Sequence, residues 1–447
     1  MSSSLSSSRM RRVPREAHSD ARARSTAGLP PDSLARSLLL AASAVAGVRA
    51  GQSLTAVLGT ALRNETPAAR AAARDAAYGT LRDFGCGEFI LSRLLERPLP
   101  HPETEALLLV ALYRLRTRPD SPHTVVDQAV VAAGELANGT FKGLINALLR
   151  NYLRQRDALH AAMQDSDEAT YRHPQWWISR LRRAYPESWR EILAAGNTPP
   201  PMCLRVNRRR GTVDDYFARL RAAELPARRL DGDALLLAKP VGVDSLPGFA
   251  DGLVSVQDAG AQRAAHLLGP VSGERILDAC AAPGGKAAHL LETAEIRLVA
   301  LDVDGKRAQR IDENLQRLGL SAAVVVADCR DTARWWDGQP FDAILADVPC
   351  SASGVVRRHP DGKYLRRESD IRRFSLLQSE ILDQLWPVLK TGGRLLYATC
   401  SVFPEENGAQ VDAFLFRWTN ARLLEKQSLL PLAHHDGFFY ALLEKTS

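Results

Sequence analysis

From about residue 270 onward, short apolar runs alternate with amphipathic stretches, and this alternation constrains the fold more than any other feature of the chain. The predicted strands are 275–279, 297–302, 323–326, 341–345 and 394–398. The predicted helices include 285–293, 306–318 and a stretch with Leu377, Ile381, Leu385 and Leu389 at steps of four. Strands that alternate with helices form a parallel sheet covered by helices on both faces. We therefore expect an α/β domain of the Rossmann-like type over residues 270–447.

Two cysteines follow predicted strands of this domain. Cys350 comes just after the apolar run 341–347, and Cys400 comes just after the run 394–398. In an open parallel sheet, ligands bind outside the carboxyl ends of the strands. Two thiols at that edge indicate covalent chemistry in which one thiol is the nucleophile.

A glycine-bearing turn follows the first predicted strand and has the sequence Asp-Ala-Cys-Ala-Ala-Pro-Gly-Gly-Lys over 278–286. Such a turn brings backbone N–H groups and a helix N-terminus to a ligand. A phosphate-binding P-loop is excluded, because Ala287 follows Lys286 and Cys280 takes the place of the first glycine. The dinucleotide fingerprint GxGxxG is absent as well. The remaining cofactor class has no phosphates and a cationic amino-acid portion, which predicts S-adenosylmethionine.

Acidic residues at the ends of three successive strands suit that cofactor. Asp302 lies 24 residues after Asp278 and could accept hydrogen bonds from both ribose hydroxyls. Asp328 is placed to accept from the adenine amino group, and Asp347 lies near the expected methyl donor. A single acid at a strand end is as well explained as a helix cap or a solvated loop residue. Three of them in register favour a binding site.

The two thiols fit methylation of cytosine at carbon 5, which is a poor nucleophile. A thiolate that adds to carbon 6 turns the ring into an enamine, and carbon 5 can then attack a methyl group. A base must afterwards remove the carbon 5 proton, and a carboxyl group such as Asp347 near N3 would steady the adduct. We expect the remaining cysteines to serve packing (Cys86, Cys203, Cys329) or to line the cofactor turn (Cys280).

A basic segment lies between the two thiols and is opposed by only three acids. Its members are Arg357, Arg358, His359, Lys363, Arg366, Arg367, Arg372 and Arg373. Runs of this kind usually form a solvated face. Beside a candidate active site, this segment is predicted to form a phosphate-binding rim.

The rest of the chain divides into three parts. Residues 1–30 are rich in Ser, Ala and Arg, and we expect a disordered basic tail. Residues 31–164 have helical spacing with breaks at Pro and Gly, which predicts an all-helical bundle. Residues 165–269 are mixed and predict a small α+β module between the two larger domains.

Composition narrows the partners. The net charge of +7 favours a polyanion partner. No CxxC pair occurs among the six cysteines, so we predict no metal site. No apolar h-region follows the basic start, and the apolar stretch 38–48 is too short to span a bilayer. We expect reduced thiols, a cytoplasmic location, no membrane contact and a monomer.

These motifs closely resemble the bacterial 16S ribosomal RNA cytosine-C5 methyltransferase family, often called Sun or Fmu. The stretches that carry the resemblance are 278–286 (DACAAPGGK), 347–360 (DVPCSASGVVRRHP), 397–407 (YATCSVFPEEN), 200–207 (PPMCLRVN), 256–262 (VQDAGAQ), 436–440 (DGFFY) and 141–150 (FKGLINALLR). The last of these resembles the end of the family's NusB-like helical domain. The resemblance covers nearly the whole chain after about residue 30, although Cys203 and the Ser/Arg-rich start depart from the family pattern.

The resemblance implies a role for each matched position. Cys400 would be the nucleophile, and Cys350 would assist proton removal or product release. The S-adenosylmethionine site would be lined by Cys280, Ala281, Ala282, Pro283, Gly284, Gly285, Lys286, Asp302, Asp328 and Asp347. The NusB-like bundle and the middle module would grip 16S ribosomal RNA. Two alternatives stay open here: a transfer-RNA cytosine-C5 methyltransferase, and a catalytically idle RNA-binding assembly factor.

Overall fold

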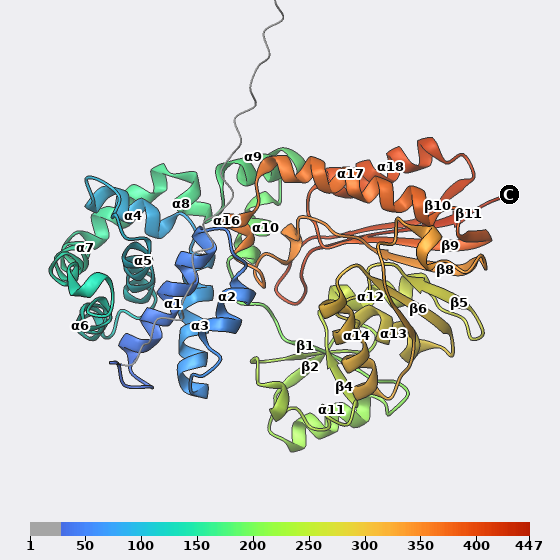
Figure 1. Cartoon of the computed structure of the whole chain (residues 1–447), viewed down its shortest axis with the longest axis horizontal. Helices are drawn as coiled ribbons and strands as arrows, with labels where there is room; N and C mark the ends of the chain where they lie inside the picture. The colour runs from blue at the N-terminus through green and yellow to red at the C-terminus, as the bar shows by residue number, and fades with distance from the viewer. Residues whose placement is uncertain (1–27) are drawn as a thin grey trace, which may run out of the picture.

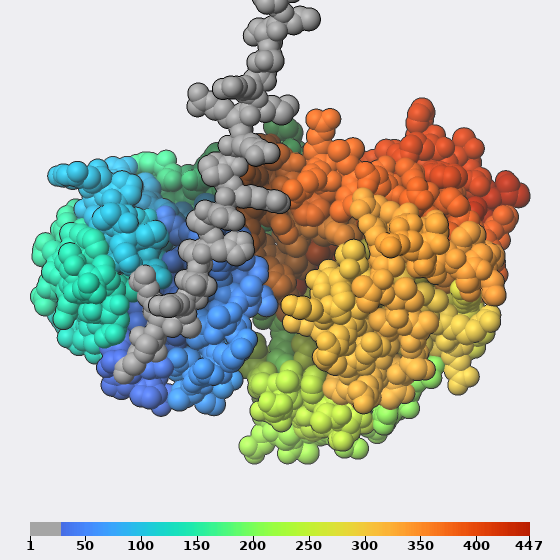
Figure 2. Space-filling view, viewed as in Figure 1, coloured from blue at the N-terminus to red at the C-terminus, as the bar shows by residue number. Residues whose placement is uncertain are grey.

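The structure, a computed structural model, describes residues 28–447 and divides into a helical bundle, a small sheet module and a large α/β domain (Figure 1). The predicted tail at 1–30 lies almost wholly outside the described residues. Figure 2 shows the surface hollowed where the bundle, the sheet module and the α/β domain meet. No helix among residues 28–447 is long and apolar enough to cross a membrane.

The N-terminal bundle is all-helical, as predicted. Its helices are α1 (Leu34–Arg49), α2 (Leu54–Ala61), α3 (Pro67–Arg82), α4 (Cys86–Leu94), α5 (Pro102–Thr117), α6 (Pro122–Ala133) and α7 (Lys142–Ala162). Side-chain oxygens of Ser33, Ser53 and Thr66 cap the first three helices by accepting from backbone N–H groups. Helix α1 packs against α2, α3, α5 and α6, so its apolar stretch is the centre of a core.

Between the bundle and the large domain lie three short helices and a four-stranded antiparallel sheet. The helices are α8 (Asp167–Tyr171), α9 (Gln175–Ala184) and α10 (Trp189–Gly196). The sheet has the order β2-β3-β1-β4 and is formed by β1 (Cys203–Val206), β2 (Ala227–Arg229), β3 (Ala234–Leu237) and β4 (Val254–Val256), with α11 (Val213–Ala222) packed on it. Trp177 and Trp189 pack with Phe403 of the large domain, so α9 and α10 join the two parts.

The large domain has a seven-stranded sheet with the order β10-β11-β9-β8-β5-β6-β7. Its strands are β5 (Arg275–Asp278), β6 (Arg297–Asp302), β7 (Ala323–Val326), β8 (Phe341–Asp347), β9 (Leu389–Thr399), β10 (Ala421–Leu429) and β11 (Phe438–Lys445). Strands β5 to β9 are parallel, as predicted. The chain leaves β5 toward β6 on one side and returns to β8 on the other. The crevice between the ends of β5 and β8 is therefore the switch point at which such sheets bind ligands.

Two features of this sheet differ from the prediction. Strands β10 and β11 were not predicted, and both run antiparallel to their neighbours, so the sheet is mixed. The predicted helix through Leu389 is also too long, because α17 (Glu368–Leu385) ends earlier and Leu389 begins β9. Leu389 lies four residues after Leu385 by chance, so the leucine spacing alone does not reveal that the helix has already ended.

Alternate residues of the strands face two separate helical layers. Ile276 of β5 packs with α12 (Ala259–Leu268), α13 (Gly285–Thr293) and α14 (Gly305–Leu318), whereas Leu277 packs with α17 and α18 (Gly408–Arg417). This period of two is what a strand imposes on its side chains. It explains why the strands read as continuous apolar runs in the sequence.

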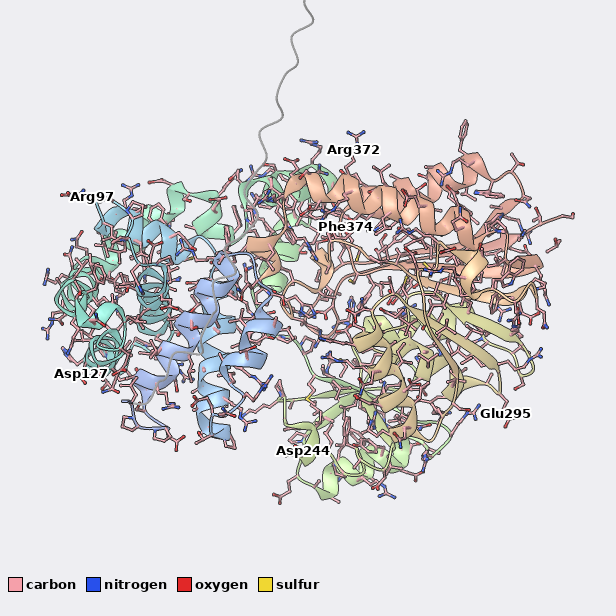
Figure 3. All side chains as sticks on the ribbon, viewed as in Figure 1. Arg97, Asp127, Asp244, Glu295, Arg372 and Phe374 are labelled. Atoms are coloured by element: carbon pink, nitrogen blue, oxygen red, sulfur yellow. The ribbon has the colours of Figure 1, made fainter. Side chains whose placement is uncertain are left out.

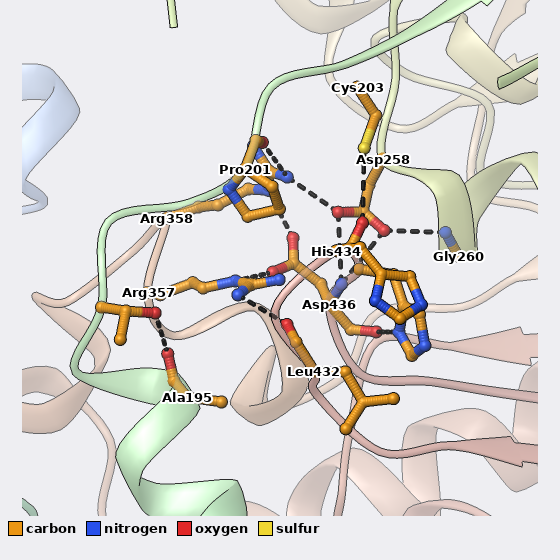
Figure 4. Close-up of polar contacts among 12 residues, drawn as sticks. Ala195, Pro201, Cys203, Asp258, Gly260, Arg357, Arg358, Leu432, His434 and Asp436 are labelled. Atoms are coloured by element: carbon orange, nitrogen blue, oxygen red, sulfur yellow. Dashed lines mark hydrogen bonds and ion pairs between the residues drawn. The ribbon is translucent and has the colours of Figure 1, made fainter. Parts of the chain in front are cut away.

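The start of the basic segment forms ion pairs inside the protein and not a solvent-facing rim. Arg357 is 1% exposed and its guanidinium pairs with the fully buried carboxylate of Asp436 (Figure 4). Arg358 pairs with the same carboxylate and, at 2.8 Å, with Asp258. The phosphate-rim prediction is therefore wrong for Arg357. Arg372, by contrast, is exposed on α17 (Figure 3).

The same segment docks the bundle onto the large domain. Lys363 is 1% exposed and donates to the carbonyl of Arg82 at 2.9 Å and to Asn197 at 2.6 Å, so the rim prediction is wrong here as well. The Tyr364 hydroxyl donates to Glu88 of α4 at 3.1 Å. These contacts tie residues more than 160 positions apart in sequence into one polar interface.

Asp436→Asn is expected to destabilise the large domain strongly. The change leaves the buried Arg357 cation without its carboxylate, and breaking a buried pair from one side costs roughly 3 kcal/mol or more. Urea unfolding followed by tryptophan fluorescence measures the shift. Asp214→Asn makes the same chemical change in the exposed Asp214–Arg229 pair, so its midpoint should stay at the wild-type value. Equal midpoints for the two variants would contradict the role given to Asp436.

Candidate active site

The two candidate thiols lie side by side at the carboxyl ends of neighbouring parallel strands. Cys350 follows β8, Cys400 follows β9, and their sulfur atoms are 3.3 Å apart. The pairing of Asp347 with Ala398 sets this register and brings the two loops level. The structure thus brings together two cysteines that lie 50 positions apart in sequence.

The environments of the two sulfur atoms differ. Cys350 is buried, whereas Cys400 is partly open. The hydrogen bond to Cys400 and burial both raise the pKa of Cys350 well above its ordinary value. The raised pKa favours the neutral thiol at Cys350, and the more accessible Cys400 is the candidate nucleophile.

The buried carboxylate of Glu406 is hydrogen-bonded to both of the loops that carry the thiols. Glu406 accepts hydrogen bonds from the Ser351 backbone N–H at 2.8 Å, from the Ser351 hydroxyl at 2.6 Å and from the Ser401 hydroxyl at 2.5 Å. Burial raises the pKa of Glu406, although the hydroxyl and amide donors oppose the shift. Since Ser351 and Ser401 each follow a cysteine, one side chain fixes the position of both sulfur atoms.

The turn after β5 approaches the thiols from the third strand. Gly284 has a φ of +95°, and a Cβ there would lie 3.1 Å from the Cα of Ile311, so the turn requires glycine to pack on α14. The next helix begins at Gly285 and carries Lys286, whose Nζ lies 2.6 Å from the Asp347 carboxylate. Burial would lower the pKa of Lys286, but Asp347 and the nearby Cys400 sulfur outweigh it and the pKa rises. A cation is thus held close to the candidate nucleophile.

Asp278, which ends β5, is the strongest sign of a missing cationic partner. Asp278 is 1% exposed, and no side chain among the described residues donates a hydrogen bond to either carboxylate oxygen, although the Cys280 backbone N–H lies close enough to lower its pKa. Burial and the neighbouring Asp347 raise the pKa of Asp278 to about 7, against the opposing effect of Lys286. An orphaned buried carboxylate needs an explanation, and a ligand cation provides one. The amino-acid portion of S-adenosylmethionine carries such a cation, so these residues fit that cofactor.

The other predicted cofactor residues surround the same crevice. Asp302 ends β6, and its carboxylate accepts from the backbone N–H of Ala282 at 3.2 Å. Asp328 lies just beyond β7, where Arg330 pairs with it at 2.7 Å and lowers its pKa. The residues between Cys280 and Gly285, namely Ala281, Ala282, Pro283 and Gly284, form the turn itself. The Cys280 thiol is hydrogen-bonded to Cys329, which together with burial raises the pKa of Cys280 well above its usual value.

Several residues of the site were not singled out from the sequence. Asp278 opens the glycine turn but was used only as a reference point for Asp302. Glu406 and Gly437 belong to motifs that carry the family resemblance, but their positions in the sequence did not indicate a role for either residue. Gly437 meets Gly354 of the Cys350 loop, where an added Cβ on Gly354 would lie 2.4 Å from its carbonyl oxygen. Only the presence of these residues in the family motifs could have pointed to them, because no other feature of the sequence indicates that the motifs meet in space.

Comparison with known proteins agrees with this geometry. Family profiles match the three parts of the chain: NusB family over residues 36–154, the ferredoxin-like domain of RsmF/B-like methyltransferases over 173–244, and 16S rRNA methyltransferase RsmB/F over 265–444. Ribosomal RNA small subunit methyltransferase B of Pseudomonas syringae pv. tomato is 44% identical over 431 residues, covering 91% of this chain and 96% of the relative. This chain belongs to the RsmB/F family of methyltransferases.

Further members and solved structures extend this assignment. The RsmB of Escherichia coli K12 is 44% identical over 411 residues and covers 89% of this chain and 96% of its own. The solved structure of PH0851 has the same fold, with a TM-score of 0.78, 24% identity and coverage of 93% of this chain and 99% of its own. NSun6 of Pyrococcus horikoshii, solved with the S-adenosylmethionine analogue SFG, has a TM-score of 0.56, 21% identity and coverage of 61% and 98%. The cofactor of the protein described here is S-adenosylmethionine.

Binding of S-adenosylmethionine is expected to release a proton from Asp278. At about pH 6 this carboxyl group is mostly protonated, because its pKa is about 7, and a cation beside it favours the ionised form. Affinity should therefore rise with pH up to about 7 and then level off. Isothermal titration in two buffers of different ionisation enthalpy measures the proton. Asp278→Asn should bind more weakly and release none, and an unchanged proton count in that variant would contradict the assignment.

Proposed function

We propose that this protein methylates carbon 5 of a cytosine in 16S ribosomal RNA through a covalent adduct with Cys400. The observation that carries the proposal is the placement of two thiols 3.3 Å apart at the ends of β8 and β9, beside the crevice that the cofactor turn borders. A methyltransferase that acts on oxygen or on an amino nitrogen needs no such pair. Membership in the RsmB/F family supports the substrate class.

The proposed steps use the side chains that surround this crevice. The Cys400 thiolate, with the Lys286 ammonium close by, adds to carbon 6, which forms an S–C bond and opens the C5–C6 double bond. Asp347 faces the same crevice and would steady the ring nitrogen side of the adduct. Bound S-adenosylmethionine supplies the methyl group. Carbon 5 gains the methyl group as its bond to the cofactor sulfur breaks. A base then accepts the carbon 5 proton with assistance from Cys350, the double bond re-forms, and the bond between carbon 6 and the Cys400 sulfur breaks to return the thiolate.

The other parts of the chain are proposed to hold the RNA. The hollow between the bundle, the sheet module and the α/β domain gives room for a structured strand from which one base is splayed (Figure 2). Exposed arginines on α17, such as Arg372 and Arg373, lie on this domain and can contact phosphates. We place the boundaries of these parts at 31–164, 165–269 and 270–447.

Cys400→Ala is expected to abolish methyl transfer, because without its sulfur no adduct can form at carbon 6. The measurement is the transfer of labelled methyl groups to 16S ribosomal RNA, with transfer RNA as a second substrate pool. Cys86→Ala is the matched control, since it removes a buried thiol in the helical bundle, outside the proposed chemistry, and it should retain activity. Turnover by Cys400→Ala would overturn the nucleophile assignment, and transfer to transfer RNA alone would overturn the substrate.

Cys350→Ala is expected to accumulate RNA linked to the protein. The adduct would still form through Cys400, but its release would lack the neighbouring thiol at 3.3 Å. A denaturing gel resolves the linked species by its retarded migration. The double variant Cys350→Ala/Cys400→Ala should show no such band. If Cys350→Ala turns over normally and leaves free RNA, the release role fails.

A further inference from the structure

A cluster of two histidines and one aspartate lies where the sheet module meets the α/β domain, away from the proposed chemistry. Asp233 sits in the turn between β2 and β3, His266 on α12 and His289 on α13. The Nε2 atoms of His289 and His266 lie 3.8 and 4.0 Å from Asp233 Oδ2. One potential ligand atom from each residue lies within 4.8 Å of the other two.

His289 gives the second and independent sign of a ligand. Its ring is 2% exposed, and neither nitrogen has a hydrogen-bond partner among the described residues. Buried polar atoms are almost always paired, and an unpaired one indicates an absent water or ion. The nearest acidic oxygen, Asp233 Oδ2, lies 3.8 Å from its Nε2, which is longer than an ordinary hydrogen bond.

The surroundings are shaped to keep the three ligands together. Gly232 has a φ of +65°, and a Cβ there would lie 3.2 Å from the His266 Nε2, so only glycine lets the turn come this close to the ring. Arg208 donates to Asp233 Oδ1 at 3.1 Å, which fixes the carboxylate and leaves Oδ2 directed at the histidines. The nearby Arg205 is neutralised by its paired carboxylate Glu292 at 2.8 Å.

We propose that Asp233, His266 and His289 bind a divalent transition metal of the zinc class that clamps the sheet module to the α/β domain. Two imidazoles and one carboxylate suit such ions better than Mg²⁺ or Ca²⁺, which prefer oxygen ligands. Zinc bonds of about 2.0–2.1 Å place tetrahedral ligands roughly 3.3 Å apart, so binding needs the ligand atoms, now within 4.8 Å of one another, to close in by at most about 1.5 Å. Because His266 is half exposed, water can fill the fourth position.

The proposal differs from the sequence-based expectation of no metal. That expectation rested on the absence of closely spaced cysteines. Here the three ligands are separated by 33 and 23 positions and come from three elements, so no spacing motif exists in the sequence. The clamp also does not depend on the proposed methyl transfer, because none of its ligands borders the thiols.

Zinc titration of the full-length, chelator-treated protein tests the site. We expect one equivalent of Zn²⁺ to bind, Mg²⁺ not to compete, and the thermal midpoint to rise with Zn²⁺. His266→Ala removes a half-exposed ligand without opening a core, and Asp233→Asn weakens the carboxylate, so each should lower the affinity at least tenfold and abolish the thermal shift. His123→Ala removes an exposed histidine on α6 and should behave as the wild type.

Binding by the paired thiols is the main competing outcome, and it is distinguishable. Cys350→Ala/Cys400→Ala should keep the zinc equivalent, and Co²⁺ should give an absorption spectrum without a thiolate charge-transfer band. The proposal is overturned if Zn²⁺ does not bind, if His266→Ala binds as tightly as the wild type, or if the double cysteine variant loses the equivalent.

Discussion

The buried carboxylate of Glu406 is the contact on which the site depends. It accepts hydrogen bonds from residues that directly follow Cys350 and Cys400, and Gln378 of α17 donates to it from the helical layer behind. Without this acceptor, two buried hydroxyls and one backbone N–H would lose their partner. The 3.3 Å separation of the sulfur atoms is therefore set by a side chain that touches neither of them.

The basic side chains of this protein differ in how they are paired, depending on whether they are buried or exposed. Arg357, Lys363 and Arg205 are all fully buried, and each meets a carboxylate or a set of oxygen acceptors that compensates its desolvation. The arginines Arg372 and Arg373 of α17, by contrast, are exposed, and Arg373 pairs with Asp370 of the same helix at 3.1 Å. The basic side chains named here thus form two groups, one that is buried and held by acceptors and one that lies at the surface.

Much of the α/β domain followed from its sequence. Strands β6 and β7 and helix α13 have the predicted bounds. Strand β6 is mostly buried, and β7, although it is a partly exposed edge strand, is an unbroken run of Ala and Val. Strand β10 could not be recognised in this way. It lies at the sheet edge, and its residues alternate between partial burial and exposure with four charged or polar side chains in its middle. Asp278 was overlooked for a different reason, since the absence of a partner is a property of the folded surroundings.

The sequence alone determined the alternation of the parallel strands with their helices, the glycine turn and the positions of the two thiols relative to strand ends, because these are local consequences of periodicity and of turn chemistry. The tertiary structure decided which charges are buried, that Lys286 pairs with Asp347, that Glu406 supports both cysteines, and that three distant ligands converge at the edge of the sheet module. Those facts depend on contacts between residues tens to hundreds of positions apart. Only the packing of the sheet and its helices brings such residues within reach of one another.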